Sequence, residues 1–306
     1  MGIVVDKRIK TVNMRMAMRA VADLALPRVC VVCGRPLILY EEHLCTCCRA
    51  DMPLTWFWDL RHNPMSEAFN ARIQDTLDRY EPFSFATALF YYSGPYRNIT
   101  RALKYHRNFA TGRFFARLLG ERLRSAFAYA KRLPVAAGND VKSAGNDVKS
   151  AGNDGSVMPG LHPVMPDPHA VMPDLIGHPL AAPPIDLVVP VPLHWTRKLR
   201  RGYNQADIIA RGIAAELAVP ACCRLLVRRR STRSQTSLSP EERRANVASA
   251  FAVRPKVLRR LHTNHILLVD DVFTTGATLL ACHRALRAAL GSEVIISVAT
   301  LAYVGR

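Results

Sequence analysis

Two adjacent carboxylates, Asp270 and Asp271, stand shortly before the hydroxyl-rich stretch T-T-G-A-T. The backbone amides of such a stretch, placed in a turn at a helix N-terminus, form an anion-binding nest, and threonine hydroxyls add donors. Carboxylates repel a phosphate, but they accept hydrogen bonds from the two hydroxyls of a ribose. The motif therefore predicts a site for a phosphorylated sugar, in which the phosphate is held by Thr274, Thr275, Gly276, Ala277 and Thr278.

A group of cations follows a second apolar segment, Asp186 to Pro192. Within eight positions it offers His194, Arg197, Lys198, Arg200 and Arg201. Open α/β sheets bind ligands beyond the carboxyl ends of their strands, and the group is expected there. A pyrophosphate would suit these charges, whereas charge alone is equally consistent with a solvated basic loop.

Four cysteines near the N-terminus form two C-x2-C pairs, Cys30 with Cys33 and Cys45 with Cys48. Two such pairs can complete a tetrahedral Zn²⁺ site, and four sulfur ligands leave no open position for catalysis. A short segment with so few apolar residues needs a staple of this kind. Cys47 can replace Cys45 or Cys48 as a ligand, and His43 is a weaker alternative. We therefore predict a structural zinc ribbon.

Regular elements must position these groups. The apolar run Ile266–Val269 is typical of a strand buried on both faces, with the two carboxylates ending it. Residues 85–92 and 293–302 also have strand character. Helical spacing of apolar residues recurs at 99–106, 114–123, 206–217 and 279–290. This alternation predicts an α/β fold with a parallel sheet.

The composition sets limits on location and partners. The chain has 306 residues and a net charge of +18, which predicts attraction to polyanions such as nucleic acid. We find no apolar run long enough to span a membrane and no secretory pattern, so we expect a cytoplasmic protein. Its eight cysteines then indicate metal or free thiols rather than disulfides. Residues 14–26 have helical spacing, which favours a helix packed on the next domain over one at a membrane surface.

Two segments differ from the rest of the chain. Residues 134–184 contain tandem A-G-N-D-V-K-S copies and repeated V-M-P, without any aromatic residue. Such a composition cannot bury enough surface to fold, so we predict a disordered insertion there. Residues 228–246 are polar and basic, typical of a mobile loop that closes over a phosphorylated substrate or binds a nucleic-acid backbone.

Taken together, these motifs resemble those of the ComF/GntX family of phosphoribosyltransferase-like proteins, known in relation to natural competence. The resemblance covers nearly the whole chain outside residues 1–13 and the insertion. It is most specific at V-D-D-V-F-T-T-G-A-T, which looks like the phosphoribosyl pyrophosphate motif of type I phosphoribosyltransferases, although Phe273 stands where a smaller aliphatic residue is common. Supporting motifs are the two cysteine pairs, V-P-V-P-L-H, R-G-Y-N-Q-A and R-S-Q-T-x-L.

The resemblance implies roles for these residues. Asp270 and Asp271 would contact the ribose hydroxyls as the catalytic pair. Val191, Pro192 and Arg201 would meet the pyrophosphate, and Mg²⁺ would bridge ligand oxygens. Clustered positive charge would stabilise the leaving pyrophosphate. The family also implies single-stranded DNA as a partner, together with a competence helicase or recombination mediator.

We accordingly expect a helix plus zinc ribbon over 14–60, and a type I phosphoribosyltransferase-like domain formed by 83–133 and 185–306. The leading hypothesis is a phosphosugar-binding protein that assists uptake or processing of single-stranded DNA during transformation. The alternative is an active phosphoribosyltransferase with an unidentified nucleobase as acceptor. A binding module that has lost all ligand chemistry is disfavoured, because both aspartates and all three threonines are present.

Overall fold

The structure, a computed structural model, describes residues 21–23, 27–57, 59–60, 62–74, 85–132, 184–229 and 250–305. Its elements in chain order are α2 (Thr46–Ala50), α3 (Pro64–Gln74), β1 (Ala86–Tyr91), the 3-10 helix η1 (Gly94–Tyr96), α4 (Arg97–Tyr105), α5 (Phe109–Arg132), β2 (Leu187–Pro190), α6 (Trp195–Arg201), α7 (Gln205–Leu217), β3 (Leu226–Arg228), β4 (Phe251–Val253), α9 (Pro255–Leu258), β5 (His265–Phe273), α10 (Ala277–Leu290) and β6 (Ile295–Tyr303).

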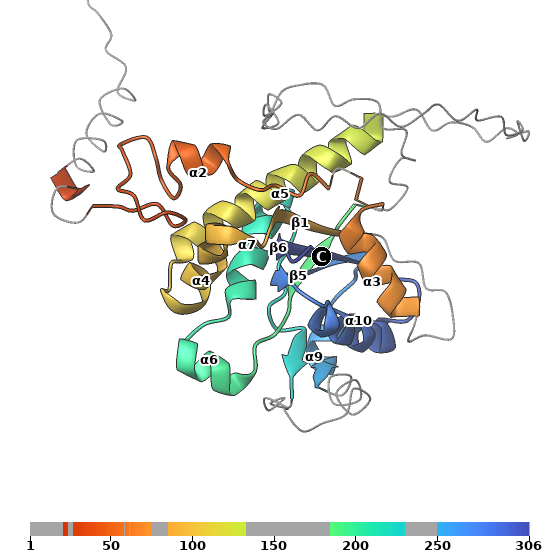
Figure 1. Ribbon diagram of the computed structural model, residues 1–306. Coiled ribbons are helices and arrows are strands. Elements are labelled where there is room, and N and C mark those ends of the chain that lie inside the picture. Colours follow the sequence, from red (N-terminus) through yellow and green to blue (C-terminus); the bar gives the residue numbers. More distant parts are fainter. Residues whose placement is uncertain are drawn as a thin grey trace, which may run out of the picture.

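A four-stranded parallel sheet in the order β1-β6-β5-β2 forms the centre of the molecule (Figure 1). β5 and β6 are the two inner strands and each has nine residues. Because all four strands point the same way, their carboxyl ends meet at one edge of the sheet. The loops that leave this edge belong to distant parts of the sequence, so the fold brings them together.

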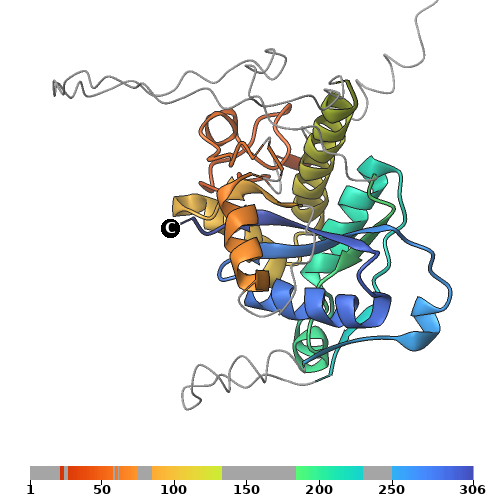
Figure 2. The same cartoon turned by 90° about the vertical axis from the view of Figure 1, so that its right-hand side faces the viewer.

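Helices cover both faces of the sheet, as a parallel sheet requires (Figures 1 and 2). One apolar cluster joins α4, α5 and α7 to one face, with Ile99, Phe115 and Ile209 among its fully buried members. The second cluster joins α3 and α10 to the other face through residues such as Phe69 and Leu286. The expected α/β fold with a parallel sheet is confirmed.

β5 is longer than the apolar run from which the strand was predicted. The sequence predicted that the strand ends at Val269, but it continues through both aspartates to Phe273. The reason is its partner: β6 offers backbone pairing opposite Asp270, Val272 and Phe273. β2 ends earlier, at Pro190 beside Val269. The last four residues of β5 therefore have a paired edge toward β6 and extend past the end of β2.

Some expectations fall on residues outside those described. The predicted helix over 14–26 is described at 21–23 alone, where the backbone is helical. The predicted insertion over 134–184 is described at its last residue only, and the loop over 228–246 only at its first two. The domain boundaries remain predictions. Within the described residues, no helix has both the length and the apolar character needed to cross a membrane.

Candidate phosphosugar site and four-cysteine cluster

The two adjacent aspartates lie near the carboxyl end of β5, beyond the end of the neighbouring strand β2. Neighbouring residues of a strand point to opposite faces. Asp271 is buried and faces α4, whereas Asp270 retains some exposed surface. The Asp271 amide donates a 2.8 Å hydrogen bond to Oδ1 of Asp270, so the Asp270 carboxylate bends forward along the strand. Two carboxyl groups of different exposure thus stand at one edge of the sheet.

Asp271 forms an ion pair with Lys104, the penultimate residue of α4, at 2.7 Å between Nζ and Oδ2. Both side chains are largely enclosed, with 25% of Lys104 and 7% of Asp271 exposed. Burial acts to lower the pKa of Lys104, but its charge attraction and hydrogen bond to Asp271 outweigh burial and raise that pKa above its ordinary value. The lysine is therefore a firmly charged counter-ion within the site.

Asp270 has the opposite electrostatic character. Burial of its carboxyl raises its pKa well above the usual range, and the neighbouring charge of Asp271 adds to the rise. Arg228 of β3 lies close enough to Asp270 for the two charges to interact. Burial lowers the pKa of Arg228, and Arg197 lowers it further. A divalent cation or a ribose hydroxyl would favour ionised Asp270, because both interact best with a carboxylate.

The turn after β5 presents its polar groups to solvent. Thr274 and Thr275 are exposed, and Gly276 caps α10 with φ +73°. A Cβ on this glycine would meet the Phe273 ring at 2.7 Å, so the glycine is required by backbone conformation and by close packing. α10 has fourteen residues, and its first amides have no acceptor within the helix itself. The turn and the start of α10 therefore leave backbone amides without intrahelical acceptors, and the buried Phe273 ring packs against Gly276.

The segment after β2 is hydrogen-bonded to β5 just before the two aspartates. The Val191 amide donates to the Val269 carbonyl at 2.8 Å, which closes the last link between β2 and β5. The backbone amide of Val191 is therefore already used, and Pro192 has none. The basic residues that follow form the short helix α6, so the alternative of a basic loop does not hold for them. His194 begins this helix by accepting a bond from the Thr196 amide through Nδ1.

Arg201 and the residues after it anchor that segment to α4 and α7. The Arg201 guanidinium lies over the Tyr105 ring at 5.3 Å and donates to Gln205. Its Nε is buried without a hydrogen-bond partner among the described residues. Tyr203 donates through its hydroxyl to the Leu103 carbonyl near the end of α4. The R-G-Y-N-Q-A motif therefore joins the two helices that border the site.

Asn204 completes this anchoring. Its Nδ2 donates to the Val191 carbonyl at 3.0 Å and to Asp207, while its Oδ1 accepts from the amide of Ala206 and caps α7. One buried amide side chain thus fixes the end of β2 against the start of α7. The arrangement brings together three sequence-distant groups: the aspartates with their turn, Lys104, and the segment from Val191 to Arg201.

The four predicted cysteine ligands come together. The Sγ atoms of Cys30, Cys33, Cys45 and Cys48 all lie within 4.8 Å of one another. Cys33 and Cys45 are 3.7 Å apart between sulfurs, close to the edge of about 3.8 Å that four Zn–S bonds of about 2.3 Å give a tetrahedron. Four thiols in this geometry fit a structural Zn²⁺ ion, which would crosslink the two chain turns.

The alternative ligands lie elsewhere. Cys47 is exposed, and its sulfur accepts from Arg35 at 3.7 Å. His43 contacts the Thr111 hydroxyl through Nδ1 at 3.2 Å. The cluster therefore uses Cys45 and Cys48, because the α2 turn directs Cys47 away from the other sulfurs.

The ribbon that carries the four-cysteine cluster is attached to the helix that carries Lys104. The Tyr96 hydroxyl donates to the Cys48 carbonyl at 3.0 Å, and the Asn98 side chain donates to the Val32 carbonyl at 3.1 Å. Each acceptor lies in one of the two cysteine turns. The start of α4 is thus held by the cluster, while its end reaches Asp271.

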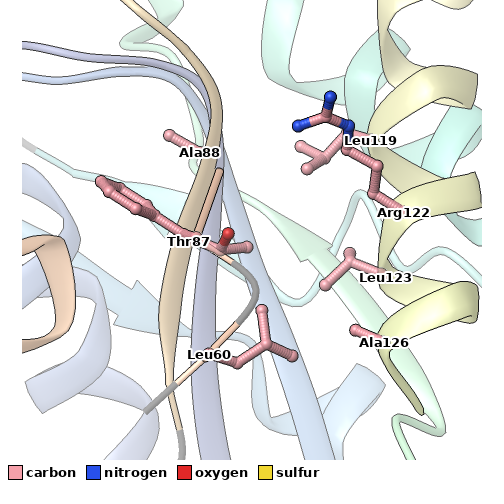
Figure 3. Close-up of a pocket in the computed structure, with 8 residues that line it drawn as sticks. Leu60, Thr87, Ala88, Leu119, Arg122, Leu123 and Ala126 are labelled. Atoms are coloured by element: carbon pink, nitrogen blue, oxygen red, sulfur yellow. The ribbon is translucent and has the colours of Figure 1, made fainter. Parts of the chain in front are cut away.

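A small cavity lies between α5 and the first half of β1, at a distance from these groups (Figure 3). Figure 3 shows Arg122 extending from α5 toward β1, above the apolar side chains of Leu119 and Leu123. Burial lowers the pKa of Arg122 to about 10, and its guanidinium lies over the Trp56 ring at 5.2 Å. The lining contains neither of the two aspartates, so this cavity is separate from the candidate phosphosugar site.

Lys104 is the site residue whose position the sequence did not indicate, whereas Arg228 begins the basic segment that was predicted to close over the ligand. Lys104 lies in the stretch 99–106, for which the sequence predicted a helix but no contact with the aspartates. The packing of α4 on the sheet brings Lys104 to Asp271, and the β3–β4 pairing holds Arg228 near Asp270.

Known proteins are similar to this chain in sequence. Residues 199–305 match the phosphoribosyl transferase domain family. The chain is 37% identical over 118 residues to Competence protein F of Haemophilus influenzae, covering 39% of this chain and 50% of that protein. It is 36% identical over 94 residues to DNA utilization protein YhgH of Escherichia coli strain K12, covering 31% of this chain and 40% of that protein. YhgH of Salmonella typhi matches to the same extent.

The aligned part thus spans half or less of these curated relatives. The sequence match includes the turn after β5, and the observed parallel sheet and four-cysteine cluster agree with the expected architecture. Residues 199–305 are thus similar to phosphoribosyl transferase domains, and the chain is similar in sequence to Competence protein F and DNA utilization protein YhgH.

Proposed function

We propose that this chain binds phosphoribosyl pyrophosphate, or a closely related phosphosugar, with Mg²⁺ at the carboxyl edge of its sheet. The observation that carries the proposal is the position of Asp270 and Asp271 directly before a glycine turn that begins a long helix. The turn offers amides and hydroxyls to the 5′-phosphate, and the carboxylates offer acceptors to the ribose.

Positive groups around the carboxylates suit the pyrophosphate. Lys104 reaches Asp271 from α4, and Arg228 lies near Asp270. Arg201 ends α6 with a buried donor that lacks a partner among the described residues. An anionic ligand that approaches between these side chains would be stabilised by all three. A bound Mg²⁺ would bridge ligand oxygens and reduce repulsion between the ligand and the aspartates.

The biological role is proposed from the relatives. One is named a competence protein and another a DNA utilization protein. Together with the net charge of +18, this supports a role in handling single-stranded DNA during uptake or processing. A competence helicase or recombination mediator is the corresponding protein partner. Transfer of phosphoribose to a nucleobase is the second candidate, favoured by the retention of both carboxylates beside the anion nest.

Titration calorimetry with Mg²⁺ and phosphoribosyl pyrophosphate tests the site. Heat should be released by the wild-type protein and lost in Asp270→Asn/Asp271→Asn. Glu293→Gln is a suitable control, because it removes an exposed carboxylate just before β6, at the opposite edge of the sheet. Absence of heat from the wild type, or equal heat from the double variant, would refute the phosphosugar site. Release of pyrophosphate on addition of a nucleobase would select the transferase alternative.

A further inference from the structure

α6 is a helix whose apolar side is exposed. None of its seven residues is buried, and Trp195 and Leu199 are 65% and 79% exposed. They are four positions apart and so lie on one side of the helix. Most helical stability in proteins comes from packing an apolar face, and α6 buries no such face against the described residues. Both views show α6 projecting from the lower end of the molecule (Figures 1 and 2).

The ends of α6 hold it in place instead. His194 is buried and caps the start, while Gly202, at φ +82°, ends the helix. These caps preform the helix without covering its sides. An exposed tryptophan on a preformed helix is costly to leave in water and suits a surface that is covered by a binding partner.

The charge of this helix specifies the chemistry of that partner. Four of its seven residues are cations, and no acidic residue occurs between Asp186 and Asp207. Fields of this kind attract polyanions. Arg197 of the helix and Arg228 of β3 both lie close enough to the buried His194 to act on it, which places their positive charges in one region, and burial together with these charges lowers the pKa of His194.

A second exposed ring extends the surface beyond α6. Tyr105, at the end of α4, is 63% exposed and lies beneath the guanidinium of Arg201. Separate rings with cations between them match a single strand, whose bases stack on aromatic side chains while its phosphates meet Lys and Arg. A lipid surface would instead require apolar residues along one face of a longer helix.

We propose that α6 and Tyr105, here called the α6 platform, form the surface on which this chain binds single-stranded nucleic acid. Trp195 and Tyr105 stack on bases, and Arg197 and Arg200 contact phosphates. The proposal rests on the DNA-handling role given above and assigns it a location. Because the segment from Val191 to Arg201 joins the platform to the phosphosugar site, both ligands would contact one continuous stretch of chain.

Fluorescence anisotropy with a labelled oligodeoxythymidylate tests the platform. Trp195→Ala should weaken binding about 10-fold, the usual effect of removing one stacking ring, whereas Trp195→Phe keeps a ring and most of the affinity. Arg197→Ala/Arg200→Ala should reduce the slope of log affinity against log salt by about 1.4, because each lost phosphate contact removes about 0.7. Binding should also quench indole fluorescence in the wild type, and Trp195→Phe should lose this quenching.

The control is Arg113→Ala/Arg117→Ala, which removes two exposed cations of α5 that act on His43 of the ribbon. It should leave the salt slope nearly unchanged. The platform is refuted if this control weakens binding as much as Arg197→Ala/Arg200→Ala, or if Trp195→Ala binds like the wild type. It is also refuted if polyglutamate, which has no bases, displaces the oligonucleotide and quenches the indole equally well.

Calorimetry with phosphoribosyl pyrophosphate separates this outcome from failure of the proposed function. Trp195→Ala should release the same heat as the wild type, which also shows that the variant is folded. If the wild type binds phosphosugar but no oligonucleotide, the nucleic-acid role fails together with the platform and the phosphosugar site stands. If it binds the oligonucleotide and every platform variant does so equally, the platform alone fails.

Discussion

Replacing Lys104 by Met removes the counter-ion of Asp271 while it preserves the length of the side chain. At 2.7 Å the gross attraction is about 6 kcal/mol for an effective dielectric constant of about 20, and desolvation of both groups offsets much of it. Exposed pairs contribute less than about 1 kcal/mol, and breaking a buried pair costs about 3–5 kcal/mol. With 25% and 7% of the two side chains exposed, we expect a loss of about 2 kcal/mol.

Urea unfolding measures this loss, with Arg101→Met as the control because Arg101 is an exposed cation on the same helix. In a double-mutant cycle, Asp271→Asn combined with Lys104→Met should be less destabilising than the sum of the single changes, since the double variant buries no unpaired charge. A coupling energy near zero would refute the ion pair as a stabilising contact.

The same variant tests the role of Lys104 in ligand binding. The ammonium competes with a divalent cation for Asp271 but attracts an anionic ligand. Lys104→Met should therefore bind Mn²⁺ alone more tightly and phosphoribosyl pyrophosphate more weakly, as read by electron paramagnetic resonance and calorimetry. A general structural defect would weaken both. Affinities that change in the same direction would contradict the proposed role.

Three further predictions follow from the site and its supports. The pKa of Asp270 is raised to about 8 in the folded protein, whereas the unfolded residue has its ordinary pKa, so the fold should lose stability as pH rises between these two values. Asp270→Asn should therefore raise Tm at pH 9 but not at pH 4. Equal shifts at the two pH values would contradict this. Gly276→Ala places a side chain on a left-handed backbone and 2.7 Å from Phe273, so it should lower the free energy of unfolding in urea by about 2–4 kcal/mol. Gly34→Ala has φ +76° but open space around it, so it should lower this free energy by only about 1–2 kcal/mol. If the four-cysteine cluster binds Zn²⁺, adding a chelator should release the contacts that hold the start of α4, so amide hydrogen exchange should accelerate in α4 and not in β6. Unchanged exchange in α4 would show that the ribbon does not support that helix.

Much of this protein could be predicted from local sequence. The spacing of Cys30, Cys33, Cys45 and Cys48 was sufficient to predict the cluster, because ligands on two short turns are constrained by chain geometry alone. The apolar run before Asp270 and the helical spacing after Gly276 were sufficient to predict a buried strand, a turn and a helix, because periodicity reports which faces are buried.

Contacts between distant segments were decided only by the tertiary structure. β5 extends past Val269 because β6 pairs with it, and the end of α6 is placed by the contact of Arg201 with the Tyr105 ring of α4. Lys104 contacts Asp271 although more than a hundred and sixty residues of sequence separate them, so no local pattern predicts this ion pair. The motif around Asp270 therefore predicts which chemical groups a ligand would meet on one strand. Which charges surround it depends on the helices that the fold packs against the carboxyl edge of the sheet.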